Sequence, residues 1–279
     1  MAYRDPGTAG VVMRGLVSVE PSDGPLIYPS SSNLDLDDDN DWDQSQTGTG
    51  AKDRDNVKFK GTKIDLFQYA PKPVPIPMEL LLNKAANVES IVSRQLFRKS
   101  ERSIEKLLTK GNGAGKGEGF LAAGAGVASV VSQDANLPTW ASILNTLYAI
   151  PEQWAGGQLT WVCQRLSYPV VLSITDPAGF YIFALAAQAA PNTILGVPVK
   201  FNQFMDGPRA AGGFDTNAHP YAVGNWSAAM VMAEAPGAER VTRFDDSNFH
   251  PGAGFAITNL VGCKVVEPNA IRLMKIAVS

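Results

Sequence analysis

The segment 74–120 constrains the fold more than any other, because it joins an extended lead-in, a long helical pattern and a glycine-rich end. Proline lacks a backbone donor and disfavours helix in the residue before it, so the prolines in 73–77 keep the lead-in extended. A helical repeat then covers 88–109, with Asn87 as the expected N-cap and Gly111 as the expected stop. Such a helix would be ~33 Å long, which suits a strut lying across a surface.

The helical repeat has a packed face and a charged face. The expected packed face consists of Val88, Ile91, Val92, Gln95, Leu96, Ile104, Leu107 and Leu108. The charged face consists of Arg94, Arg98, Lys99, Glu101, Arg102 and Glu105. So many charges are incompatible with a core, and we therefore expect the charged face to remain on the surface.

Glycines at alternate positions from Gly111 to Gly119 invite a phosphate-loop interpretation, which we reject. A phosphate loop of the form G-x-x-x-x-G-K-[ST] follows a strand and precedes a helix, so that backbone N–H groups meet the phosphates. Here the run follows a helix, and Gly117 occupies the position that needs Ser or Thr. The dinucleotide spacing G-x-G-x-x-G fails as well, because Lys116 stands at the third glycine position. No nucleotide or other cofactor is expected.

The long helix followed by GNGAGKGEGF resembles the G-D-G-x-G-x-P-x-G-I signature of tailed-phage major capsid proteins with the Hong Kong 97-like fold. Gly117 replaces the usual proline of that signature. Further segments resemble the family's motifs in the family's order: 77–81, 159–163, 176–183, 194–199, 223–226 and 267–271. The resemblance extends from Leu26 to the C-terminus.

The resemblance implies an α+β fold of four parts. These are an N-arm at 1–25, an E-loop hairpin at 26–72, a P-domain at 73–119 and 244–267 with its spine helix at about 88–109, and an A-domain at 120–243 and 268–279. In the family the A-domain is a central mixed sheet flanked by helices. Early helices and late strands favour the α+β class independently.

The residue patterns place the remaining elements. Helices are predicted at 139–150 and 164–174, the second bent or broken near Pro169. Strands are predicted at 159–163, 197–201, 221–223, 228–233, 240–244, 255–257, 263–266 and 271–276. Residues 1–25 show little periodicity, which suits either an extended arm ordered by other subunits or a frayed terminus.

Segment 26–72 has the pattern of a long hairpin with a polar tip. Its acidic residues are Asp35, Asp37, Asp38, Asp39, Asp41 and Asp43, and the basic residues that follow include Arg54, Lys58, Lys60 and Lys63. A hairpin this polar has no core of its own, so we expect it to dock on another chain. We expect these residues, together with Arg94, Arg98 and Arg102, to make intersubunit contacts.

The aspartates imitate the start of a calcium loop, but no metal site is expected. In D-x-D-x-D-G the sixth position is glycine and the twelfth is a bidentate glutamate. Asn40 and Gln46 occupy those two positions here. We therefore interpret the acidic block as a solvated or subunit-paired patch.

The chain offers little for catalysis, so we do not expect an enzyme. His219 and His250 are its two histidines, and each precedes a proline outside any catalytic motif. Cys163 and Cys263 lie in apolar runs typical of buried thiols in a reducing compartment. The first residues are polar and do not resemble a signal peptide, and the longest apolar run, 180–190, is too short to span a membrane.

The resemblance implies a structural role. It implies a major capsid subunit forming homohexamers and homopentamers of an icosahedral shell around double-stranded DNA, located in the virion and assembled in the bacterial host's cytoplasm. The implied partners are the subunit itself, portal and scaffolding proteins, decoration proteins, and DNA held non-specifically at the inner face. The net charge of −3 argues against general nucleic-acid binding. An encapsulin-type shell shares the fold and is the first alternative, although 1–25 lacks the amphipathic helix with which such shells begin. An enzyme of unknown type is the second.

Some relatives weld neighbouring subunits through an isopeptide bond between a hairpin lysine and an asparagine, helped by a buried glutamate. Lys58, Lys60 or Lys63 would supply the amine here, but 249–257 contains no asparagine. Asn259 is the nearest candidate, and no glutamate follows it in 260–264. We therefore predict a shell held by non-covalent contacts alone.

Overall fold

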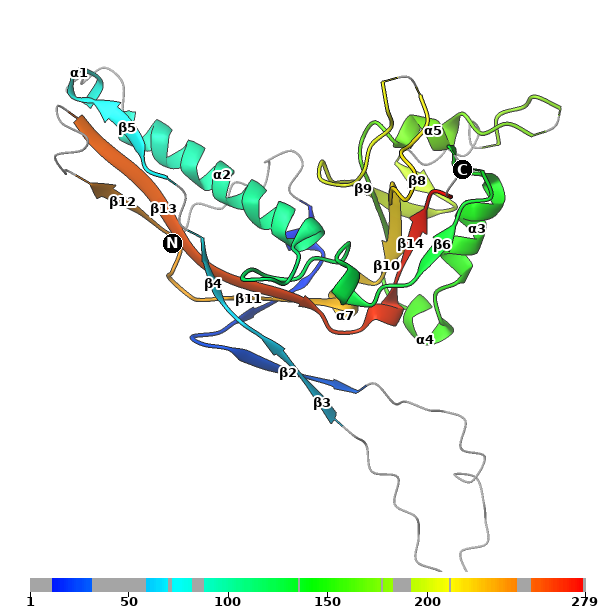
Figure 1. The fold of residues 1–279 in the computed structure, drawn as a ribbon, viewed down its shortest axis with the longest axis horizontal. Coiled ribbons are helices and arrows are strands. Elements are labelled where there is room, and N and C mark those ends of the chain that lie inside the picture. The colour runs from blue at the N-terminus through cyan, green and yellow to red at the C-terminus, as the bar shows by residue number, and fades with distance from the viewer. Residues whose placement is uncertain are drawn as a thin grey trace, which may run out of the picture.

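A computed structural model describes residues 12–31, 59–69, 72–81, 88–134, 136–176, 178–182, 192–210, 212–244 and 252–277. The acidic block, Arg54, Lys58, Asn87 and His250 lie outside these ranges, and so do the predictions made for them. The described part contains two six-stranded sheets and one two-stranded sheet, with helices packed on the larger sheets. The α+β class is therefore confirmed (Figure 1).

The predicted long helix is α2, Val88–Lys110, and the lead-in is strand β5, Val74–Pro77, followed by the short helix α1, Met78–Leu81. The helix ends as predicted, with the Gly111 N–H donating to the Leu107 carbonyl at 2.8 Å. Figure 1 shows α2 running along the first sheet.

Three residues of α2 differ from the prediction, and one of them is Gln95, which was expected on the packed face and is exposed. Ile91, expected on the packed face, is 52 % exposed, because at 3.6 residues per turn it lies about 140° around the helix from the buried Leu96. Glu105, expected on the charged face, is 0 % exposed. It does lie on that side of the helix, but residues 12–17 cover it there.

The first sheet is built around one strand, β13, Gly252–Val265. Strands β11, Met230–Glu234, and β12, Arg240–Phe244, pair with one edge of β13, and β4, Phe67–Tyr69, and β5 pair with the other. Strand β1, Ser18–Pro21, extends the sheet by pairing in parallel with β11.

Two predictions about this region were wrong. Segments 255–257 and 263–266 belong to one strand rather than two, and the strand continues through Gly262 between them. Glycine is needed at this position because a Cβ there would come within 2.2 Å of the Asp65 carbonyl oxygen. Residues 228–233 divide into the end of helix α7, Trp226–Ala229, and β11. Because β11 and β12 pair with β13, residues 230–234 and 240–244 lie in the first sheet, although we expected 230–243 in the A-domain.

The two faces of the first sheet contact different parts of the chain. Strand alternation points Met230 and Met232 of β11 toward the core that includes Ile104 and Leu108 of α2. Val231 and Ala233 point the other way and pack with Ile64 at the base of the hairpin. Helix α2 and the hairpin base therefore lie on opposite faces of the sheet.

The predicted hairpin is present at its base. Strands β2, Leu26–Ser31, and β3, Phe59–Ile64, pair antiparallel from Leu26–Ile64 to Ser31–Phe59. In Figure 1 they lead away from the body of the molecule, on the side of the first sheet that α2 does not occupy. The tip of the hairpin lies outside the described residues.

The second sheet has the order β6-β14-β10-β7-β9-β8. Its strands are Ser129–Val131, Ile271–Lys275, Tyr221–Gly224, Thr160–Cys163, Val197–Phe201 and Thr193–Ile194, in that order. Helix α3, Trp140–Tyr148, packs on it behind a capping box at Thr139, close to the predicted 139–150. Helix α5 spans only Tyr168–Leu172, shorter than the predicted 164–174, because Pro169 begins it instead of bending it. Helix α4, Glu152–Ala155, adds a short turn below α3.

The glycine run folds back as a tight loop after α2, with a bridge between Asn112 and Glu118. A Cβ at Gly117 would lie 2.5 Å from Cys263 Sγ, and a Cβ at Gly119 would lie 2.7 Å from the Gly111 nitrogen. Glycine is thus needed for close packing of the loop on α2 and β13, in agreement with the rejection of a phosphate-loop role.

Candidate assembly surfaces

The N-terminal segment 12–21 is fastened to its own subunit. Met13 is fully buried in the core shared by α2 and β11, and its backbone N–H donates to both oxygens of Glu105 at 3.0 and 2.9 Å. Strand β1 then continues along β11. The expectation that residues 1–25 take their order from elsewhere therefore does not hold for 12–21. We call residues 12–21 the N-terminal clasp.

Arg14 connects the clasp to two other elements. Its guanidinium pairs with Glu101 of α2 and with Glu234 of β11, the latter through Nη2 at 2.7 and 2.5 Å from the two oxygens. Burial alone would lower the pKa of Arg14, but Glu101, Glu234 and Glu239 together raise it. The arginine therefore stays charged and balances the carboxylates at this crossing.

Glu105 of α2 is the buried carboxyl group that accepts hydrogen bonds from the clasp. Burial raises its pKa from 4.5 to about 7, although the N–H groups of residues 12–14 favour the ionised form, and Glu101 raises it further. The charge on Glu105 therefore changes near neutral pH.

The exposed side of α2 is basic. Among the described side chains between Glu89 and Lys110, the exposed charged residues are Arg94, Arg98, Lys99, Arg102 and Lys106. The structure thus brings together Arg94, Arg98 and Arg102, which we predicted as contact residues. We call this surface the α2 basic face.

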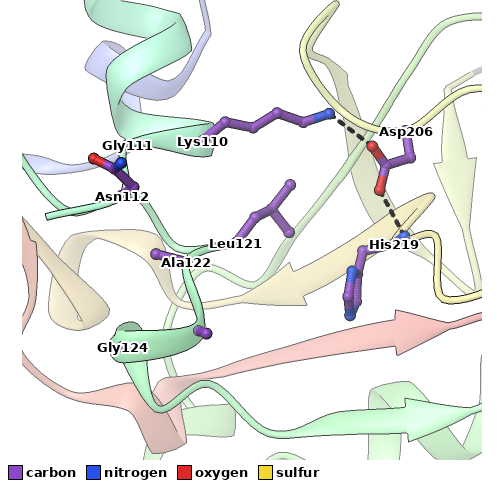
Figure 2. Close-up of a pocket in the computed structure, with 9 residues that line it drawn as sticks. Lys110, Gly111, Asn112, Leu121, Ala122, Gly124, Asp206 and His219 are labelled. Carbon is purple, nitrogen blue, oxygen red and sulfur yellow. Dashed lines mark hydrogen bonds and ion pairs between the residues drawn. The ribbon is translucent and has the colours of Figure 1, made fainter. Parts of the chain in front are cut away.

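A hollow of about 450 Å³ lies where α2 and the glycine loop meet the second sheet's loops. Figure 2 shows Lys110 reaching across it to Asp206, whose other oxygen accepts the His219 N–H. The two contacts measure 2.7 and 2.8 Å. Asp206 therefore links Lys110 at the end of α2 to His219, which lies just before strand β10 of the second sheet.

The second sheet's surroundings carry exposed apolar side chains at two places. Tyr148 at the end of α3 is 78 % exposed and Val131 of β6 is 54 % exposed. Phe180 and Tyr181, in the loop after α5, are 73 % and 59 % exposed. Large exposed aromatic side chains are common at protein interfaces.

The described residues provide little for chemistry. They contain no group of three or more metal-ligating side chains, and no described helix is long and apolar enough to cross a membrane. Cys163 and Cys263 are buried free thiols, as predicted, and burial raises the pKa of each to about 12, which keeps both unreactive. Burial lowers the pKa of His219, whose backbone rather than its ring contacts Asp206.

The remaining predicted residues lie as follows. Lys63 on β3 is exposed and pairs with Asp65 of the same chain at 2.8 Å, while Lys60 lies on β3 between Phe59 and Gly61. Asn259 is only 1 % exposed within β13, so an amine from a neighbouring subunit has no access to it. Sequence reasoning missed Arg14, Glu101 and Glu105 as a cluster, because the glutamates are 87 and more residues from Arg14 and no local pattern connects them.

Comparison with known proteins agrees with this architecture. The model of the phage capsid family matches residues 7–276. The capsid of a native GTA particle is similar over 99 % of this chain and 93 % of that one, with 21 % identity and a TM-score of 0.77. The structure from Gordonia phage Cozz is 14 % identical, with a TM-score of 0.67 over 100 % of this chain and 90 % of that one. The encapsulin SrpI of Synechococcus elongatus is 10 % identical, with a TM-score of 0.63 over 99 % of this chain and 91 % of that one. No curated protein sequence matches this chain.

The fold is that of a structural shell protein. The chain belongs to the phage capsid family, and it is a major capsid protein with the Hong Kong 97-like fold. The resemblance noted from the glycine signature and its accompanying motifs is thereby confirmed.

Proposed function

We propose that this chain assembles into homohexamers and homopentamers of an icosahedral shell that encloses the double-stranded DNA of a tailed phage. The observation that carries the proposal is the family match over 7–276, which includes both large sheets and α2. The subunit acts without catalysis, resides in the virion and assembles in the bacterial cytoplasm. Its partners besides itself are portal and scaffolding proteins, decoration proteins, and DNA at the inner face.

We assign the four parts of the fold with one change from the sequence-based boundaries. The N-arm is 1–25 and the E-loop is 26–72. The P-domain is 73–119 with 230–267, because β11 and β12 pair with β13. The A-domain is 120–229 with 268–279, built on the second sheet.

We further propose that the hairpin and α2 provide charged contacts between subunits. The residues are Asp35, Asp37, Asp38, Asp39, Asp41, Asp43, Arg54, Lys58, Lys60, Lys63, Arg94, Arg98 and Arg102. An exposed ion pair contributes only about 0–1 kcal/mol, but a shell repeats each pair in every subunit, so assembly should weaken as salt screens them.

Electron microscopy of the purified protein tests the assembly. Closed shells with hexamers and pentamers support the proposal, small discrete oligomers contradict it, and small cargo-filled shells support the encapsulin alternative that the likeness to SrpI keeps open.

Replacing 35–54 with a short Gly-Ser linker tests the hairpin. The base strands β2 and β3 remain, so the subunit should keep its circular dichroism spectrum and thermal unfolding. Shells should be absent or form only at low salt. Normal shells from this variant would remove the hairpin from the contacts.

A further inference from the structure

An open cavity of about 320 Å³ lies between β4, the second half of α2 and the glycine loop. Its lining comes from residues 67–69 of β4, from α2 between Ser103 and Lys110, from the loop within 111–116, and from Val261 of β13. We call it the β4 pocket. Its volume lies in the usual range of small-molecule sites, roughly 300–1,000 Å³.

The base of the β4 pocket is apolar. Ile104 and Val261 line it although both are buried, so they lie at its base. Phe67 and Leu107, which are half-buried, line it as well. An apolar group placed against these side chains would be removed from water together with them, which favours binding.

The two hydroxyl groups of the pocket are already satisfied within the protein. The Tyr69 and Ser103 hydroxyls are hydrogen-bonded to each other at 2.8 Å, and Ser103 also donates to the Lys99 carbonyl at 3.0 Å. Each hydroxyl has one hydrogen, and these two bonds use both. The pocket therefore offers no free hydroxyl donor to a sugar or a similar polyhydroxylated ligand.

The rim of the pocket is cationic. Lys106 of α2 and Lys116 of the loop are exposed, and neither pairs with a carboxylate of the described residues. Lys110, the third lysine of the lining, is paired with Asp206 at 2.7 Å. No described carboxylate lines the pocket. A negative charge at the rim would thus meet two unpaired cations and no repelling group.

We propose that the β4 pocket binds a small amphiphilic anion, whose apolar body covers Ile104 and Val261 and whose carboxylate lies between Lys106 and Lys116. At ~30 Å³ for an atom the size of a water molecule, the cavity accommodates a body of about ten carbon atoms. A simple inorganic anion would leave the base uncovered, and a neutral hydrocarbon would leave both lysines unused. The bound ligand holds the glycine loop and the end of α2 against β4, and so stabilises the folded subunit.

Isothermal titration calorimetry of the soluble full-length subunit tests the site. The ligand is decanoate, kept below the concentration at which it forms micelles. Decanol supplies the same apolar body without the charge, and acetate supplies the charge without the body. At low salt we expect one decanoate per subunit, about three- to tenfold weaker binding of decanol, and no saturable binding of acetate. The thermal unfolding midpoint should rise with decanoate concentration.

Two variants distinguish the rim from the base. The double variant Lys106→Gln with Lys116→Gln should bind decanoate and decanol within about twofold of each other, because the charge preference is lost. Its control, Arg165→Gln with Lys200→Gln, removes the same charge from exposed positions outside the pocket and should bind like the wild type. Ser103→Phe places a ring in the pocket and should abolish binding of both ligands. Circular dichroism shows whether each variant is folded.

Several results would overturn the proposal. The absence of saturable decanoate binding would do so, as would unchanged decanoate binding in the double lysine variant or in a folded Ser103→Phe variant. Decanol binding as tightly as decanoate to the wild type would remove the lysines from the site, and acetate binding as tightly would remove the apolar base. These measurements use the soluble subunit, so failure to form shells would contradict the proposed function and leave the pocket proposal unaffected.

Discussion

At the residue scale, Glu105 makes the stability of the subunit depend on pH. Its pKa in the folded chain is about 7, above the ordinary 4.5, because burial disfavours the carboxylate. Between these values the folded chain holds a proton that the unfolded chain has released. Stability from this group is therefore greatest at low pH and falls as pH rises from about 4.5 to about 7, by roughly 3 kcal/mol at most.

Glu105→Gln should abolish this dependence. The amide keeps an oxygen to accept the Met13 N–H, but it does not titrate, so the variant should gain stability relative to the wild type at pH 8 and lose that gain near pH 5. Urea unfolding of the soluble subunit from pH 5 to 8 measures it. Glu101→Gln is the control: it weakens the Arg14 contact without removing the slope. An unchanged slope in Glu105→Gln would assign the pH dependence to other groups.

Gly117→Ala tests the packing of the glycine loop. The new methyl group would lie 2.5 Å from Cys263 Sγ and 2.9 Å from the Cys263 nitrogen, so β13 or the loop must move, at a cost of roughly 1–3 kcal/mol. Gly156→Ala has no atom within 4 Å of its Cβ and should change stability by less than about 0.5 kcal/mol. Equal stability of the two variants would mean that the loop is not closely packed.

At the element scale, some features of α2 could be predicted from the sequence and others could not. Its span and its end at Gly111 follow from local signals, namely the prolines before it, the helical spacing and the glycine after it. The burial of Glu105 does not, because it depends on residues 12–17, more than 85 positions away. β13 was divided in the prediction for a similar reason: Gly262 within it lies against the Asp65 carbonyl, a contact far away in the chain that no local pattern indicates.

Two aspartate substitutions on α2 distinguish its packed and exposed sides. Leu96 is 3 % exposed and packs with Ile76 and Phe255, so Leu96→Asp buries an unpaired charge and should cost several kcal/mol. Ile91, which the sequence placed on the same face, is exposed, and Ile91→Asp should cost less than about 1 kcal/mol. Thermal unfolding of the soluble subunits measures both. Similar losses from the two changes would contradict the orientation of the helix.

At the scale of the whole molecule, the candidate assembly surfaces were only partly predictable. The family and its α+β fold were visible in the glycine signature and the later motifs. The α2 basic face was not, since its charge depends on where the clasp places Glu101 and Glu105.

We expect the assembled shell to contain no covalent links between subunits. Asn259 is buried within β13, and Lys63 is engaged by Asp65 of its own chain. Boiled particles on a denaturing gel should give one band near the subunit mass of 29.7 kDa. A ladder of multiples would contradict this, and particles treated with a chemical cross-linker provide the reference ladder.

The position of β13 at the centre of the first sheet also has a kinetic consequence. It pairs with β4 and β5, almost two hundred residues earlier, and β14 likewise lies between β6 and β10 in the second sheet. Sheets that depend on such distant pairings form slowly, because the intervening chain must be ordered before the contacts are made. During synthesis the first sheet lacks its central strand, and the second sheet lacks the strand that joins β6 to β10, until residues 252–275 have left the ribosome. A nascent chain therefore has no complete surface to offer a shell, and premature association is delayed until translation has passed β14.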